Sequence, residues 1–138
     1  MVKNLWGDLP KPDTIRLPAV MLQEQADLIT EMTGGVIRGK VDTGKDSDGD
    51  LYAQLILQVP LLSNYQYYLV HTYSKGIRIY PAFLGLVEAP EPHTEVAGPK
   101  EFEATLENLL SSKFTKEVVG SLLAQATSLS VRSTEKKK

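Results

Sequence analysis

Alternation of side-chain types from Leu51 to Val59, with Ile56 as the exception, constrains the fold more than any other feature of this chain. One side of the run is apolar and comprises Leu51, Ala53, Leu55, Leu57 and Val59. The other side comprises Tyr52, Gln54, Ile56 and Gln58. Because successive side chains of a strand point to opposite faces, this pattern predicts a half-buried β-strand.

Three other segments also have strand character. Residues 65–73 and 77–83 are rich in aromatic and branched side chains, and residues 36–42 alternate between polar and apolar types. Ser74, Lys75 and Gly76 predict a tight hairpin between the two later runs. The register of this hairpin stays open. A three-residue loop with a bulge would exchange the side chains of the two faces relative to a two-residue loop. With a two-residue loop, one face would carry His71, Tyr73, Arg78 and Tyr80.

Helical periodicity precedes and follows the strand-like runs. A first helix is predicted to begin at Pro18 and to end at Gly34, with Leu22, Ala26 and Ile29 in its apolar stripe. A second is predicted to begin at Pro99. Thr115 is the expected N-cap of a third.

The order of these segments predicts an α+β fold. We expect a single antiparallel sheet of about four strands in a meander, with one N-terminal and two C-terminal helices packed mainly on one face. The sheet core is expected to include Leu55, Leu57, Val59, Ile77 and Ile79. The helix residues expected to meet it are Leu22, Ile29, Leu106, Leu110 and Leu122.

The length of 138 residues predicts one domain, spanning residues 1–127. Within it, residues 1–17 are expected to form an extended arm, in which Trp6 either packs its ring onto the domain or is exposed to a partner. Residues 88–99 contain three prolines and predict a long mobile loop. Residues 128–138 are polar and end in three lysines, which predicts a flexible tail.

Composition excludes several classes of function. The absence of cysteine rules out disulfides, thiolate catalysis and cysteine-bound metals. A net charge of -2 argues against a dedicated duplex-DNA-binding protein. The apolar runs are too short to cross a bilayer and the first ten residues lack a signal-peptide pattern, so we expect a cytoplasmic protein with no membrane contact.

Residues that could support catalysis or bind a metal are scarce. The acidic loop at residues 46–50 fails as an EF-hand, because Leu51 and Leu57 occupy the positions that require glycine and glutamate. His71 and His93 are separated in sequence and form no metal-binding motif. We therefore predict no metal site, no cofactor and no catalytic residue, with a small hydrolase-like enzyme using His71 or His93 as a base kept as an alternative.

The function is expected to come from aromatic and basic side chains. The leading hypothesis is a non-catalytic protein-interaction or adaptor module that binds a protein partner or a second copy, using an aromatic sheet face and the proline-rich loop. The expected partner-binding residues are Trp6, Tyr65, Tyr67, Tyr73, Arg78, Tyr80 and His93. The alternative is weak binding of single-stranded nucleic acid, for which the basic residues are Arg38, Lys40, Lys75 and Arg78.

Overall fold

The computed structural model describes residues 2–11, 15–89 and 91–136, with side chains described as far as residue 129. In chain order, the elements are α1 (Pro18–Met32), β1 (Arg38–Lys45), β2 (Leu51–Val59), the short 3-10 helix η2 (Pro60–Leu62), β3 (Tyr65–Ser74), β4 (Ala82–Leu86), β5 (Thr94–Val96), α2 (Pro99–Leu110) and α3 (Lys113–Lys136). The expected α+β fold is confirmed.

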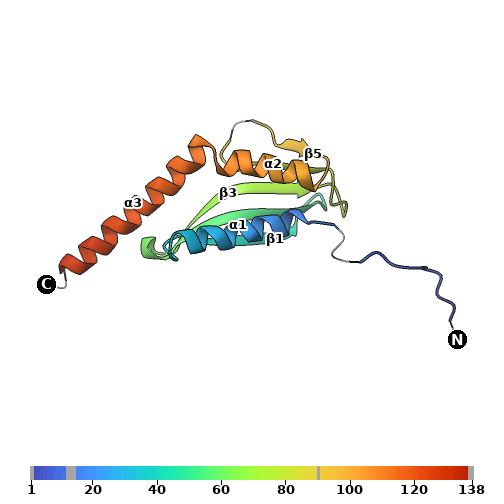
Figure 1. Cartoon of the computed structure of the whole chain (residues 1–138), viewed down its shortest axis with the longest axis horizontal. Coiled ribbons are helices and arrows are strands. Elements are labelled where there is room, and N and C mark those ends of the chain that lie inside the picture. Colours follow the sequence, from blue (N-terminus) through green and yellow to red (C-terminus); the bar gives the residue numbers. More distant parts are fainter. Residues whose placement is uncertain (1, 12–14, 90, 137–138) are drawn as a thin grey trace.

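All five strands form one antiparallel sheet in the order β1-β2-β3-β4-β5, so each strand pairs with its neighbours in sequence. The predicted meander is therefore correct and contains one more strand than expected. The alternating run is β2 with the predicted bounds, and β1 begins two residues later than predicted. Figure 1 shows α1 and α2 over the sheet and α3 leading away from it.

A bulge in β3 determines which face each of its aromatic side chains occupies. Leu55 of β2 pairs with Val70, whereas the next residue, Ile56, pairs with Tyr68, so Leu69 is an extra residue in β3. An extra residue in one strand of a pair shifts the alternation beyond it. Tyr65 and Tyr67 therefore pair with residues of the apolar side of β2, whereas Tyr73 pairs with Tyr52 on the other side.

Two expectations about the C-terminal half of the sheet are wrong. The fourth strand is Ala82–Leu86 and not residues 77–83, and Ile77 is 87% exposed in the connection before it. Pro81 has no N–H to give to a ladder, and pairing begins at the next residue. Residues 88–99 were expected to form a long mobile loop, yet within them Thr94–Val96 pairs with β4, between Pro92 and Pro99. Pro90 lies outside the described residues.

The core lies between the sheet and the helices, and most of its predicted members are confirmed. Leu55, Leu57 and Val59 are buried, as are the helix residues Leu22, Leu106 and Leu122. Ile29 and Leu110 are partly buried against them. Ile77 and Ile79 were wrongly assigned to the core, because Ala82, Leu84 and Leu86 occupy the inward positions of β4.

Helix α1 packs directly on β1 at a glycine. A Cβ atom at Gly39 would lie 2.3 Å from the backbone oxygen of Ala26. The hydroxyl of Thr30 accepts a hydrogen bond from the Gly39 N–H at 2.8 Å and donates one to the Ala26 carbonyl at 2.9 Å. The absence of a side chain at Gly39 therefore permits the closest approach of helix and sheet.

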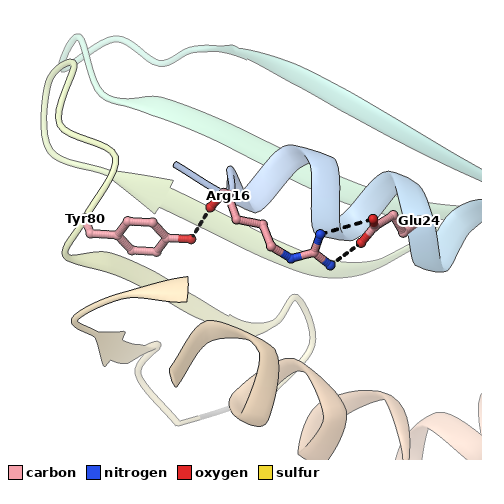
Figure 2. Close-up of polar contacts among 3 residues, drawn as sticks. All are labelled: Arg16, Glu24 and Tyr80. Atoms are coloured by element: carbon pink, nitrogen blue, oxygen red, sulfur yellow. Dashed lines mark hydrogen bonds and ion pairs between the residues drawn. The ribbon is translucent and has the colours of Figure 1, made fainter. Parts of the chain in front are cut away.

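The chain is anchored where it enters α1 (Figure 2). The Arg16 guanidinium makes two hydrogen bonds to the Glu24 carboxylate, and the Tyr80 hydroxyl donates to the Arg16 carbonyl at 2.7 Å. Burial raises the pKa of Tyr80, partly offset by the charge of Arg16. Tyr80 therefore connects the loop between β3 and β4 to the start of the first helix.

The cap of α3 is Ser112 and not Thr115. The Ser112 hydroxyl accepts from the backbone N–H of Thr115 at 3.2 Å. Thr115 is buried instead, and its hydroxyl donates to the Leu109 carbonyl at 2.7 Å, which satisfies the end of α2. The predicted boundary at residue 128 falls within α3, and the flexible tail stays a prediction.

Candidate functional site

One face of the sheet is covered by α1 and α2, and the opposite face, called the open face below, carries aromatic, basic and amide side chains. Cross-strand pairing assigns its members, since residues directly opposite each other share a face. On the first two strands these members are Arg38, Lys40, Asp42, Tyr52, Gln54, Ile56 and Gln58. On the next three they are Gln66, Tyr68, His71, Tyr73, Phe83, Gly85 and Glu95. His93, just before β5, joins them through its contact with His71.

Five rings on this face form a continuous cluster, called the ring cluster below: Tyr52, His71, Tyr73, Phe83 and His93. Tyr73 and Phe83 stack with centroids 4.9 Å apart and planes at 14°. His71 lies 6.1 Å from Tyr52 and 5.8 Å from Tyr73. Each ring of the cluster is partly exposed, so the face is aromatic without being sealed from solvent.

A hydrogen bond joins the two histidines at the centre of the cluster. Nδ1 of His71 and Nε2 of His93 are 3.0 Å apart, and one of these nitrogens must donate to the other. Burial lowers the pKa of both rings, and the neighbouring His93 lowers that of His71 further, against the opposing charge of Asp46. Both shifts favour the neutral imidazoles, in which one nitrogen of the pair donates and the other accepts.

Two glycines provide the space in which outer rings of the cluster lie. A Cβ atom at Gly85 would be 2.7 Å from Nδ1 of His93, so that imidazole rests against the backbone of β4. A Cβ at Gly44 would be 2.8 Å from the hydroxyl oxygen of Tyr52. Both rings are thus held against the sheet, and their positions depend on the lack of a side chain beneath them.

One basic side chain, Lys75, lies beside the ring cluster. Its Nζ lies 5.5 Å from the centroid of the Tyr73 ring and 3.6 Å from the carboxylate of Asp50. Arg38 and Lys40 are exposed on the same face but farther along β1, opposite Gln58 and Ile56, and Asp42 is the β1 residue opposite Gln54. The open face therefore combines rings with one adjacent cation and with two more toward one end of β1.

The predicted partner-binding residues do not form one surface. Tyr73 and His93 belong to the ring cluster, whereas the bulge places Tyr65 and Tyr67 on the helix-covered side, beside a cavity of about 420 Å³ between β3 and α3. Burial, with the hydrogen bond and charge of Glu88, raises the pKa of Tyr67 to about 12. Tyr65 and Tyr67 therefore lie on the other face of the sheet from Tyr73.

Three other predicted residues lie in separate places. Tyr80 binds the backbone of Arg16, and Arg78 is exposed in the loop before β4. Trp6 is 82% exposed in the N-terminal arm, so its ring does not pack onto the domain, and the alternative that it contacts a partner stays a prediction. Of the four basic residues, Arg38 and Lys40 lie on β1, while Lys75 and Arg78 belong to the β3–β4 loop.

Two members of the ring cluster, Tyr52 and Phe83, were not among the predicted site residues. The contact between His71 and His93 was not predicted either, because it joins residues of two different segments. Alternation in β2 already placed Tyr52 opposite the apolar side, and that was the one available signal.

Three cavities of about 310 to 560 Å³ lie in the described part of the chain, and neither His71 nor His93 lines any of the three. None of these three cavities therefore supplies the concave site that a catalytic base would require beside either histidine. Across residues 2–11, 15–89 and 91–136, no cluster of three or more histidine or carboxylate side chains is arranged to hold a metal ion. In the same part of the chain, no helix combines the length and the apolar character needed to cross a bilayer.

No protein-family model, curated protein sequence or solved structure matches this chain.

Proposed function

We propose that this protein is a non-catalytic interaction module that binds a protein partner through the open face. The observation that supports the proposal is the ring cluster, five rings linked by successive contacts on the side of the sheet that α1 and α2 leave uncovered. Aromatic side chains of this kind are enriched at the centres of protein interfaces.

The fixed positions of the rings in the cluster favour a binding role over a surface that is simply exposed to solvent. Rings that are already held in position lose little conformational freedom when a partner covers them. Here Tyr73 is held by stacking on Phe83, and His93 by its hydrogen bond to His71 and by the backbone at Gly85. The partner would therefore meet a rigid surface with polar ring atoms available for hydrogen bonds.

Site-specific photocrosslinking tests which surface a partner touches. A photoreactive residue at Gln54, at the centre of the open face, is expected to crosslink a partner in native lysate. In the matched control, the photoreactive residue replaces Asn108, which is exposed on α2, and no such crosslinked product is expected. Crosslinking from Asn108 alone would contradict the proposal.

A pair of tyrosine variants then tests the ring cluster itself. Tyr73→Ala removes the ring that contacts three other members, and it is expected to reduce partner retrieval at least tenfold. Tyr65→Ala removes an exposed tyrosine from the opposite face of the same strand and is expected to leave retrieval unchanged. Equal retrieval by both variants would contradict a role for the cluster.

A second candidate function is weak binding of single-stranded nucleic acid on the same face. The observation that favours it is the position of Lys75 over the Tyr73 ring, with Arg38 and Lys40 along β1. Stacking rings flanked by cations suit unpaired bases and their phosphates. Fluorescence titration with oligonucleotides should then show affinity that falls with salt and is weakened by Lys40→Ala. The absence of binding at low salt would exclude this function.

A cytoplasmic location is part of the proposal. Cell fractionation with an antibody against the full chain tests it, and recovery in the soluble cytosolic fraction is expected.

A further inference from the structure

The two edges of the sheet differ in length. The strand at one edge, β5, has three residues, whereas β1 at the other edge has eight and pairs only with β2. An edge strand presents N–H and C=O groups with which another chain can pair, and proteins often protect an edge by keeping its strand short. The β5 edge is protected in this way, and the β1 edge is left long.

Two hydrogen bonds show which backbone groups of β1 face away from the sheet. The Gly39 N–H donates to the hydroxyl of Thr30 on α1 at 2.8 Å, so it points away from β2. The Asp46 N–H, just after the strand, donates to the Asp50 carbonyl at 2.9 Å and therefore points inward. Backbone groups alternate between the two sides along a strand. The outward-facing residues that follow Gly39 are therefore Val41, Thr43 and Lys45.

Helix α1 covers the start of this edge and leaves the rest free. The outward N–H of Ile37 donates to the hydroxyl of Thr33, at the C-terminal end of α1, at 3.1 Å, and the Gly39 N–H is bound by the same helix. The later outward N–H groups make no hydrogen bond to any residue that the structure describes. Residues 41–45, called the free edge below, are therefore open to pairing with another strand.

We propose that the free edge of one copy pairs antiparallel with the free edge of a second copy, on a two-fold axis at Thr43. In this register Thr43 faces its counterpart and Val41 faces Lys45, and each of these pairs exchanges two main-chain hydrogen bonds. A register centred on Val41 would instead require the Gly39 N–H, which Thr30 already binds. The pairing joins two five-stranded sheets into one and closes on itself.

The distribution of charge along β1 favours a second copy as the occupant. On the open face the strand begins with the exposed Arg38 and Lys40, and the exposed Asp46 and Asp48 follow its end. An antiparallel copy reverses this order, so Lys40 lies opposite Asp46 of the other chain and Arg38 lies near its Asp48. Asp42, between the two groups, lies opposite a glycine. A parallel copy would place like charges side by side, which is unfavourable.

Single cysteines test both the pairing and its register, because the chain contains no cysteine of its own. Thr43→Cys places two thiols opposite each other at a Cα separation of about 5.5 Å, which suits a disulfide. Brief oxidation should therefore give a covalent dimer. Lys45→Cys is the matched control, since Lys45 is also exposed on the free edge but would lie about 14 Å along the edge from its counterpart. Equal crosslinking of the two variants, or none with Thr43→Cys, would overturn the proposal.

Amide hydrogen exchange in NMR tests the pairing in the unaltered chain. As concentration rises, the N–H groups of Val41, Thr43 and Lys45 should become at least tenfold slower to exchange, while the mass doubles in sedimentation equilibrium. The Gly39 N–H is the internal control, because its bond to Thr30 exists in the single chain and should protect it at every concentration. A chain that stays monomeric, or a dimer that leaves the free edge unprotected, would contradict the proposal.

An exchange of charges tests the antiparallel arrangement. Arg38→Asp and Asp48→Arg should each weaken dimerisation by about threefold or more, because each brings like charges together across the interface. The double variant should restore wild-type dimerisation, since the reversed residues then meet each other. A double variant weaker than both single variants would overturn the arrangement. Because none of these substitutions touches the ring cluster, the result is independent of the function proposed for the open face.

Discussion

The helix-covered and open faces of the sheet use the same strands but differ in nearly every side chain. On β2 the covered face carries Leu55 and Leu57, while the open face carries Tyr52 and Gln54. Burial of aliphatic side chains drives folding without directional contacts, whereas the rings of the open face are positioned by stacking and a hydrogen bond. One face therefore supplies most of the apolar core, and the other presents positioned rings and polar groups to solvent.

The largest effect is expected from truncating the covered face. Leu57 is 2% exposed, and Leu57→Ala should lower the free energy of unfolding by about 2–5 kcal/mol. Gln54→Ala, on the other face of the same strand, should change it by no more than about 0.5 kcal/mol. Urea denaturation of both variants measures the difference. Similar losses would show that the two faces share the stabilising role.

Adding a methyl group at the closest helix–sheet contact should have the next largest effect. A Cβ at Gly39 collides with the backbone of Ala26, so Gly39→Ala must displace α1 at an expected cost of about 1–3 kcal/mol. Gly85→Ala on the open face meets the movable side chain of His93 instead, and should cost less while shifting the His93 signals in NMR spectra. Equal destabilisation by the two variants would contradict this contrast.

Mild acid should weaken the fold through the open face. His71 and His93 have pKa values lowered in the folded state, so the unfolded chain binds protons first as the pH falls below about 6.5. Their contribution to stability is present above that pH and is lost as the pH falls through the folded-state pKa values. Thermal melts at about pH 7.5 and about pH 5.5 should differ more for the wild type than for the His71→Gln, His93→Gln variant. If the melting temperatures of the wild type and the variant fall equally between the two pH values, the acid sensitivity comes from groups other than these two histidines.

The smallest effect is expected from removing a buried polar atom on the covered face. The Thr72 hydroxyl is buried and has no hydrogen-bond partner among the described residues. Thr72→Val keeps the shape and removes an unsatisfied group, so stability should stay the same or rise by up to about 1 kcal/mol. Loss of stability in urea denaturation would indicate that the hydroxyl has a partner in solution.

Periodic segments of the fold were predictable from the sequence. The β2 alternation, the apolar stripe of α1 and the proline at the start of α2 each give a local signal, and the structure confirms those elements. The β4 and β5 strands are short, so branched residues in the preceding loop, such as Ile77, gave a competing signal of similar strength.

The candidate site was less predictable because it depends on register. Leu69 reverses the faces along β3, and no local property of the residue distinguishes it from an ordinary strand leucine. The His71–His93 contact depends in turn on β5 reaching β4. Such contacts are set by tertiary pairing, which local propensity does not encode.

The meander has a consequence for how the chain folds. Each strand pairs only with its neighbours in sequence, so the loops that must close to form the sheet are short. Topologies dominated by such local pairing fold faster than those that join distant segments. The strands emerge from the ribosome in the order in which they pair, and α2 is synthesised last among the elements that cover the sheet. Until α2 arrives, the strands on which it packs, β4 and β5, lack their covering helix, so the apolar side chains of Leu84 and Val96 are open to aggregation or to chaperone binding during this interval of synthesis.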